Sequence, residues 1–210
     1  MSATVGLLDK REIPETAKTL TRSFDDSPLM VHCVPNHGRR PLILRSFFRA
    51  AIRDARPFEG VFVARDSDRV LGASVWLPPD RYPPSTLRQL RQLTGTFTLP
   101  GPLAPGGVQA SLRYLRAAEQ AHPKAPHWYL AVLGVDPALQ GTGLGGRLLE
   151  PVLARADAEG RPAYLETDRE GNLSFYARFR FGLVDTLHPD GPEAPTLWTM
   201  WRDPEDPRPR

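Results

Sequence analysis

Residues 127–158 read HWYLAVLGVDPALQGTGLGGRLLEPVLARADA, and they carry the clearest structural signal in the chain. The first part, Trp128–Val135, is apolar at consecutive positions, which is typical of a strand buried on both faces. A glycine-rich turn follows, after which apolar residues recur at helical spacing from Leu144 to Ala156. The sequence therefore predicts a strand, a turn and a helix whose first N–H groups, together with the helix dipole, form an anion-binding site at Gln140–Gly146.

The glycines alone leave the identity of the anion open. A phosphate-loop nucleotide site is excluded, because no Gly-Lys-Ser/Thr follows them. A dinucleotide site stays possible, since Gly141, Gly143 and Gly146 fit G-x-G-x-x-G and Glu166 ends the next strand about 20 residues on. However, Asp136–Leu139 separate the strand from the glycines, where a dinucleotide fold has them adjacent. The dinucleotide interpretation is therefore disfavoured.

Composition predicts one soluble domain over residues 1–202 and a charged, Pro-rich, disordered tail over residues 203–210. The 210 residues are 40% hydrophobic and 24% charged, which is ordinary for a globular protein. Neither a membrane span nor a secretory signal is apparent, and the single cysteine excludes an intrachain disulfide, so we expect a cytoplasmic protein. The net charge is +3 with the basic residues scattered, so we expect no nucleic-acid partner.

Further elements follow from apolar periodicity and from turn residues. A polar turn separates two β-rich segments, which indicates an antiparallel hairpin. Asn172 is placed to cap a short helix, and Gly134 inside the central strand suggests a bulge or a close approach. The expected elements are strands at 4–8, 58–64, 70–77, 163–166, 181–187 and 196–201 and helices at 13–24, 42–52, 108–121 and 172–179, with a helical patch near 87–93.

Two motifs resemble those of the GNAT superfamily of N-acyltransferases. Val135, Pro137, Gln140 and the glycines form V-x-P-x-x-Q-G-x-G-x-G, which is similar to the acetyl-CoA signature, and Asn172–Tyr176 is similar to the N-x-x-x-Y helix. The resemblance covers residues 122–201 and is strongest to puromycin N-acetyltransferase-like proteins. It implies an α/β (α+β) fold with a mixed, mostly antiparallel sheet of six to seven strands. It also implies helices on both faces of the sheet and a splay between the two central strands.

The resemblance implies an acetyl-CoA-dependent N-acetyltransferase acting on a primary amine of a small molecule. An aminonucleoside antibiotic is one candidate acceptor. A non-catalytic acyl-CoA-binding or sensing module and a protein or peptide N-acetyltransferase remain alternatives. We expect no metal, because His32, Cys33 and His37 fit no common zinc spacing. We also expect no membrane partner. We expect a monomer or a homodimer, with acceptor-pocket elements within residues 25–121.

Each part of the reaction has candidate residues. The resemblance implies Tyr176 as the general acid for the leaving thiolate, and Glu166, at the end of its strand, is our candidate base, with His127 as a second choice. The backbone of the splayed strand and the amides of the turn are expected to hold the cofactor. The cofactor-binding candidates are Leu133, Gly134, Val135, Gln140, Gly141, Thr142, Gly143, Leu144, Gly145, Gly146, Asn172 and Tyr176.

One position departs from the family pattern. The family usually has Gly-Phe shortly after the tyrosine helix, whereas this chain has Arg180-Phe181-Gly182. A glycine there would take a positive φ at the end of the helix. The sequence thus predicts either a strained Arg180 or a shifted turn at Gly182.

Overall fold

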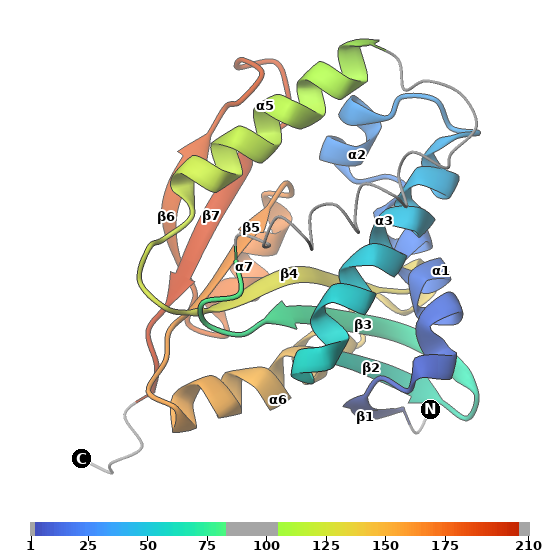
Figure 1. Cartoon of the computed structure of the whole chain (residues 1–210), viewed down its shortest axis with the longest axis vertical. Coiled ribbons are helices and arrows are strands. Elements are labelled where there is room, and N and C mark those ends of the chain that lie inside the picture. The colour runs from blue at the N-terminus through green and yellow to red at the C-terminus, as the bar shows by residue number, and fades with distance from the viewer. Residues whose placement is uncertain (1–2, 83–104, 206–210) are drawn as a thin grey trace.

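A computed structural model describes residues 3–82 and 105–205, which form one seven-stranded sheet in the order β1-β2-β3-β4-β5-β7-β6 (Figure 1). Neighbouring strands are antiparallel except for β4 and β5, which are parallel. This arrangement confirms the mixed, mostly antiparallel sheet. The strands are β1 (Thr4–Leu7), β2 (Val61–Asp66), β3 (Arg69–Leu77), β4 (Trp128–Val135), β5 (Ala163–Thr167), β6 (Gly182–Leu187) and β7 (Leu197–Arg202).

Helices cover both faces of the sheet, as predicted (Figure 1). On one face α1 and α3 bury Leu20, Phe48 and Ile52 against β2, β3 and β4. On the other face α6 and α7 pack against the central strands, while α2 and α5 share a smaller cluster around Cys33 and Tyr114. The helices are α1 (Ile13–Phe24), α2 (Pro28–Cys33), α3 (Arg40–Ala55), α5 (Pro105–Ala121), α6 (Leu144–Ala158) and α7 (Gly171–Ala177).

Two local expectations differ from the structure. The sequence reasoning missed α2, which begins at Pro28 because the Ser27 hydroxyl accepts from the N–H of Met30. Asn172 does not cap α7, because the helix starts at Gly171 and the Asn172 amide instead donates to Thr167 Oγ1 at 3.0 Å. The helical patch expected near residues 87–93 lies outside the described residues.

The two central strands separate after a short paired segment. Their register joins Trp128–Leu130 to Ala163–Leu165, whereas β4 continues to Val135 and β5 to Thr167. Figure 1 shows the two strands running in different directions beyond the paired segment. The splay predicted from the resemblance is therefore present, and it leaves one edge of β4 without a strand partner among the described residues.

A bulge in β4 lies at Ala131, not at Gly134. Val132 pairs with Val75 and Leu130 with Trp76, so Ala131 is an extra residue between them. Gly134 keeps a regular register with Ala73. Glycine is required at position 134 for a different reason: a Cβ there would lie 2.7 Å from Leu20 Cδ2 of α1. The bulge predicted at Gly134 is thus wrong in position, and the close approach is that of a helix side chain.

Arg180 takes the strained alternative. Its φ is +66°, in the left-handed region that favours glycine. The guanidinium lies 3.0 Å from the Glu205 carboxylate and donates to the carbonyl of Asp203. Residues 203–205 of the expected tail are therefore in contact with the domain, and the remainder of that tail lies outside the described residues.

A buried arginine fixes the last strand to α6. Arg202 donates through Nη1 and Nη2 to the two oxygens of Asp157, each at 2.7 Å, and through Nε to the carbonyl of Phe179. Burial favours the neutral acid, but the hydrogen bonds from Arg202 outweigh it and lower the pKa of Asp157 below its ordinary 3.8. The bidentate pair thus joins three segments of the domain.

We expect Asp157→Asn to lower the free energy of unfolding by about 2 kcal/mol at pH 7, because it leaves the buried Arg202 without its counter-charge. A carboxyl group whose pKa is lowered in the folded state stabilises the protein at pH values above its unfolded-state pKa. The difference in stability from wild type should therefore persist above about pH 4 and disappear as the pH falls through the folded-state pKa. Urea titrations at several pH values measure this difference. The exposed Asp26–Arg169 pair provides the control, since Asp26→Asn should change stability by less than about 1 kcal/mol. Equal effects of the two variants would contradict a special role for Asp157.

Candidate active site

The glycine-rich turn joins β4 to α6 at the open end of the splay. Gly141 and Gly143 have φ of +77° and +85°, and Gly143 is the N-cap residue of α6. A Cβ at either position would meet no protein atom within 4 Å. The positive φ, and not crowding by other atoms, therefore favours glycine at both positions. Thr142 Oγ1 donates to the carbonyl of Leu139 at 2.6 Å. This hydrogen bond stabilises the turn, and the opposite side of the turn is exposed to solvent.

The next two glycines serve a different purpose. A Cβ at Gly145 would lie 3.2 Å from the ring of Phe175, and one at Gly146 would lie 2.6 Å from the ring of Phe179. Both rings belong to α7 or its C-terminal end. The absence of side chains at Gly145 and Gly146 therefore lets the first turn of α6 pack closely on the segment that carries Tyr176.

The bulge determines which backbone groups of β4 face the gap. The N–H of Trp128 donates to Pro162, next to β5, whereas the N–H of Asp136 donates to Leu71 of β3. Residues eight positions apart in a regular strand point the same way, so the inserted Ala131 has reversed the alternation. Leu133 and Val135 consequently direct their backbone groups into the gap, and the Val135 carbonyl accepts from Gln140 Nε2 at 3.3 Å.

Asp136 anchors the turn to the rest of the domain. Its carboxylate accepts hydrogen bonds from Arg22 of α1 and Arg69 of β3 at 2.8 and 3.2 Å, and it also caps the short 3-10 helix Pro137–Leu139. Burial would favour the neutral acid, but the hydrogen bond from Arg22 leads the contacts that lower the pKa of Asp136. The carboxylate is therefore charged at neutral pH, and its ion pairs hold the segment that leads from β4 into the glycine turn.

Tyr176 lies on the α6 side of the parted strands. Its side chain is 6% exposed and packs with Leu165 and Met200, and its ring contacts Phe175 and Phe181 edge-on. Burial, and secondarily the charge of Asp168, raise the pKa of this phenol. Tyr176 therefore keeps its proton at neutral pH, as a general acid must.

Glu166 faces the opposite side of the sheet, because it alternates with Leu165 on β5. Its Oε2 accepts from the hydroxyl of Tyr129 at 2.7 Å, and its Oε1 lies 3.7 Å from His122 Nδ1. Glu166 and Tyr176 thus lie on opposite sides of the two strands where those strands separate. The structure places both near the gap, without bringing them into contact.

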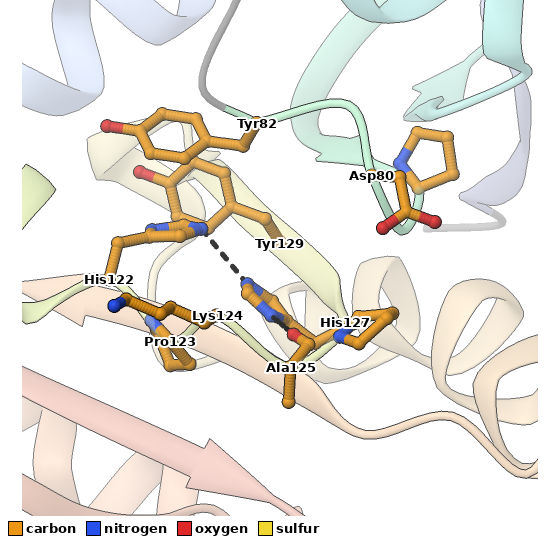
Figure 2. A pocket seen from close by; sticks show the side chains of 10 residues that line it. Asp80, Tyr82, His122, Pro123, Lys124, Ala125, His127 and Tyr129 are labelled. Carbon is orange, nitrogen blue, oxygen red and sulfur yellow. Dashed lines mark hydrogen bonds between the residues drawn. The ribbon is translucent and has the colours of Figure 1, made fainter.

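His127 lies beneath a small surface pocket and interacts with a second histidine. Its Nδ1 is 2.6 Å from the carbonyl of Ala125, and its Nε2 is 3.1 Å from His122 Nε2. Burial lowers the pKa of His127. Figure 2 shows the two rings facing one another, with Tyr82 and Tyr129 alongside. The pocket is lined by Pro78, Asp80, Tyr82, His122, Pro123, Lys124, Ala125, Pro126, His127 and Tyr129.

His122 and Tyr129 were not among the residues predicted for the site. The available signal was two histidines flanking a short Pro-rich loop just before the buried strand, but nothing in the sequence near them indicates Glu166. The candidate zinc residues lie elsewhere: His32 pairs with Asp190 at 2.7 Å, and Cys33 is buried. Of the predicted pocket region 25–121, residues 83–104 lie outside the part that the structure describes.

Comparison with known proteins shows the family. Residues 33–182 match the model of the Acetyltransferase (GNAT) family. Over 80 residues the chain is 36% identical to an uncharacterized N-acetyltransferase of Schizosaccharomyces pombe, a match that covers 37% of this chain and 32% of that protein. The chain thus aligns with about a third of the length of that curated relative.

Solved structures share the fold over nearly the whole chain. A Corynebacterium glutamicum protein described as histone acetyltransferase HPA2 and related acetyltransferase is 26% identical, with a TM-score of 0.70 and 99% of each chain covered. A Drosophila melanogaster polyamine N-acetyltransferase is 22% identical, with a TM-score of 0.65 over 96% of this chain and 100% of that chain. An agmatine N-acetyltransferase is 22% identical, with a TM-score of 0.67, over 97% and 100%.

The chain therefore belongs to the GNAT family of acetyltransferases. The family implies acetyl-CoA as the cosubstrate. Within the described residues, no helix is both long enough and apolar enough to cross a membrane.

Proposed function

We propose that the chain transfers the acetyl group of acetyl-CoA to a primary amine of a small molecule. The observation that carries this proposal is the bulged edge of β4, which directs the backbone of Leu133 and Val135 into a gap that ends at the glycine turn. An extended arm pairs with such an edge in the manner of an added strand. An anion pairs with the N–H groups at the start of α6.

The residues present fit acetyl-CoA. Leu133 and Val135 offer main-chain groups to the pantetheine arm, with Gly134 between them. We assign the pyrophosphate to the N–H groups of Gly141–Gly146, with help from Gln140, whose side-chain amide also donates to the Val135 carbonyl. Asn172, which is tied to the end of β5 through Thr167, borders the same gap on the α7 side. The thioester of acetyl-CoA supplies the acyl group.

Glu166 and Tyr176 divide the proton transfers of the reaction. Glu166 removes a proton from the acceptor ammonium, and the freed nitrogen lone pair forms a C–N bond with the acetyl carbon. A backbone N–H of the splayed edge, at Leu133 or Val135, donates to the oxyanion. The C–S bond then breaks, and Tyr176 donates its proton to the departing sulfur. The nitrogen gives up its second proton as the amide forms, and this proton returns to the Tyr176 oxygen. Glu166 releases the first proton to solvent, so each turnover yields the amide, CoA thiol and one proton.

The surroundings of Glu166 favour a small cationic acceptor. Its side chain is 9% exposed and accepts a hydrogen bond from Tyr129, whose ring lies 5.0 Å from that of Tyr82. A carboxylate and aromatic rings in one place attract an ammonium group. The solved relatives named for agmatine and for polyamines are amine acetyltransferases of similar fold. An aminonucleoside such as puromycin is a specific candidate, supported by the sequence resemblance at residues 122–201.

A protein or peptide amine is the second candidate acceptor. It is favoured by the likeness to the Corynebacterium glutamicum protein, whose description refers to a histone acetyltransferase. The two candidates differ in the size of the acceptor that the site must admit. An acceptor screen therefore separates them.

We expect the purified protein to release CoA from acetyl-CoA in the presence of at least one small primary amine. The panel comprises puromycin, agmatine, polyamines, aminoglycosides and a lysine-rich histone-tail peptide, and a thiol reagent reports CoA release. Glu166→Gln should lower kcat about 100-fold with the active amine, because it removes the base. Turnover confined to the peptide would refute the small-molecule proposal, and full activity of Glu166→Gln would refute the assignment of the base.

Replacing the general acid tests the assignment of Tyr176. Tyr176→Phe keeps the buried ring and removes only the hydroxyl, so we expect kcat to fall about 100-fold while the Kd for CoA stays within about twofold. Steady-state kinetics and calorimetric titration measure the two quantities. A parallel loss of both would show that Tyr176 has a structural role instead.

The pyrophosphate assignment predicts a selective effect at Gly143. Gly143→Val places a branched side chain at a φ of +85° on the exposed side of the turn, so we expect CoA affinity to fall at least tenfold. Gly191→Val is the matched control, because Gly191 has a φ of +89° and open space around it in the loop between β6 and β7. Equal CoA affinity in the two variants would overturn the assignment.

A further inference from the structure

Two histidines connect Glu166 to the surface pocket, and the proposed mechanism gives them no role. His122 lies between Glu166 and His127, and its side chain is 7% exposed. The Glu166 side chain is 9% exposed, whereas Asp80, Lys124 and Ala125 at the edge of the pocket are exposed. The row of polar groups thus runs from a buried carboxylate toward solvent. Figure 2 shows its outer part, the two histidines in the pocket.

The hydrogen bonds fix where the protons lie. The carbonyl of Ala125 can only accept, so His127 Nδ1 carries a hydrogen. Burial lowers the pKa of His127, which leaves its Nε2 as an acceptor at neutral pH. His122 Nε2 must therefore donate across the 3.1 Å contact. One ring nitrogen of His122, Nδ1, then remains to face Glu166.

The contact between His122 and Glu166 has room for a proton that Glu166 takes up during turnover. Without one, the Nδ1 lone pair and the carboxylate Oε1 would face each other as two acceptors at 3.7 Å. Each of these atoms is buried and has no hydrogen-bond partner among the described residues. Such orphaned acceptors are costly, and a proton on either atom relieves both. The site is thus arranged to hold and exchange one proton at this contact.

The surrounding groups leave few other routes for that proton. Tyr129 donates to the second oxygen of Glu166, and burial raises the pKa of this phenol well above its ordinary value. Tyr82 and Tyr164 also have phenol pKa values raised by burial, so neither acts as a base at neutral pH. The charged groups near the pocket, Asp80, Glu119 and Lys124, contact neither Glu166 nor His122 directly among the described contacts. The imidazole of His122 is the remaining carrier.

We infer that His122, supported by His127, carries the proton taken up by Glu166 out to the solvent in the surface pocket. The inference rests on the proposed role of Glu166 as base. In each turnover the O–H bond on Glu166 breaks as an N–H bond forms at His122 Nδ1. The N–H bond at His122 Nε2 breaks in turn, and its proton passes to His127 Nε2 or to water in the pocket. Glu166 is left as a carboxylate for the next amine, and His122 carries a hydrogen on Nδ1 only. Proton exchange of the His122 ring with water in the pocket restores the Nε2–H tautomer, so that one proton has moved from the ammonium to solvent.

The test replaces His122 by glutamine, which keeps a hydrogen-bond donor toward His127 but cannot exchange protons at neutral pH. We expect kcat with the active amine to fall at least tenfold while the KM for acetyl-CoA stays within twofold. Added imidazole should restore kcat in proportion to its concentration, because it supplies a proton carrier from solvent. His127→Gln provides a second variant and should give a smaller loss with the same response to imidazole.

His32→Gln is the matched control, since His32 also pairs with a carboxylate, Asp190, but lies outside this row. It should leave kcat unchanged and show no response to imidazole. Thermal melting of every variant separates unfolding from a loss of proton transfer.

The outcomes distinguish this inference from the proposed function. Full activity of His122→Gln, or a loss that imidazole does not restore in a folded variant, overturns the relay. If Glu166→Gln is inactive while His122→Gln is fully active, the base stands and the relay fails. If Glu166→Gln is fully active, the proposed base fails and the relay with it. Loss in His122→Gln with recovery in imidazole supports the relay.

Discussion

One inserted residue in β4 determines which backbone groups of this central strand face the gap beside β5. Ala131 reverses the alternation of the strand, so that Leu133 and Val135, and not their neighbours, face the gap beside β5. A regular strand would direct the backbone of Val132 and Gly134 there. Leu20 of α1 packs against Gly134 on one face of the strand. Because of the bulge, α1 can pack on this face while the edge of β4 keeps backbone groups free for hydrogen bonding.

Buried charges keep that edge aligned with the glycine turn. Asp136 sits where β4 ends and receives Arg22 from α1 and Arg69 from β3, so three elements meet at one carboxylate. At the other end of α6, Asp157 and Arg202 join the helix to β7. Ion pairs thus fix both the segment that leads into the glycine turn and the C-terminal part of α6.

Sequence reasoning succeeded where the determinants are local. The apolar run of β4, the hairpin of β2 and β3 and the glycine turn all depend on residues close together in the chain. The position of the bulge was wrong because it depends on the pairing with β3, which local sequence does not reveal. His122 was missed for a similar reason: its partner Glu166 is brought near only by the parallel pairing of β4 with β5. At Arg180 the family pattern left two alternatives, a strained arginine or a shifted turn at Gly182, and the positive φ of Arg180 decides for the first.

The three paired residues that join β4 to β5 give the domain a thermodynamic property. The half formed by β1–β4 and the half formed by β5–β7 share a short ladder. We assign the hydrogen-bonding capacity of β4 beyond this ladder to the pantetheine arm. A cosubstrate that occupies this gap acts as an eighth strand and becomes part of the cohesion of the sheet. Binding free energy and folding free energy are then linked, because a ligand that binds only the folded chain adds RT ln(1 + [L]/Kd) to its stability.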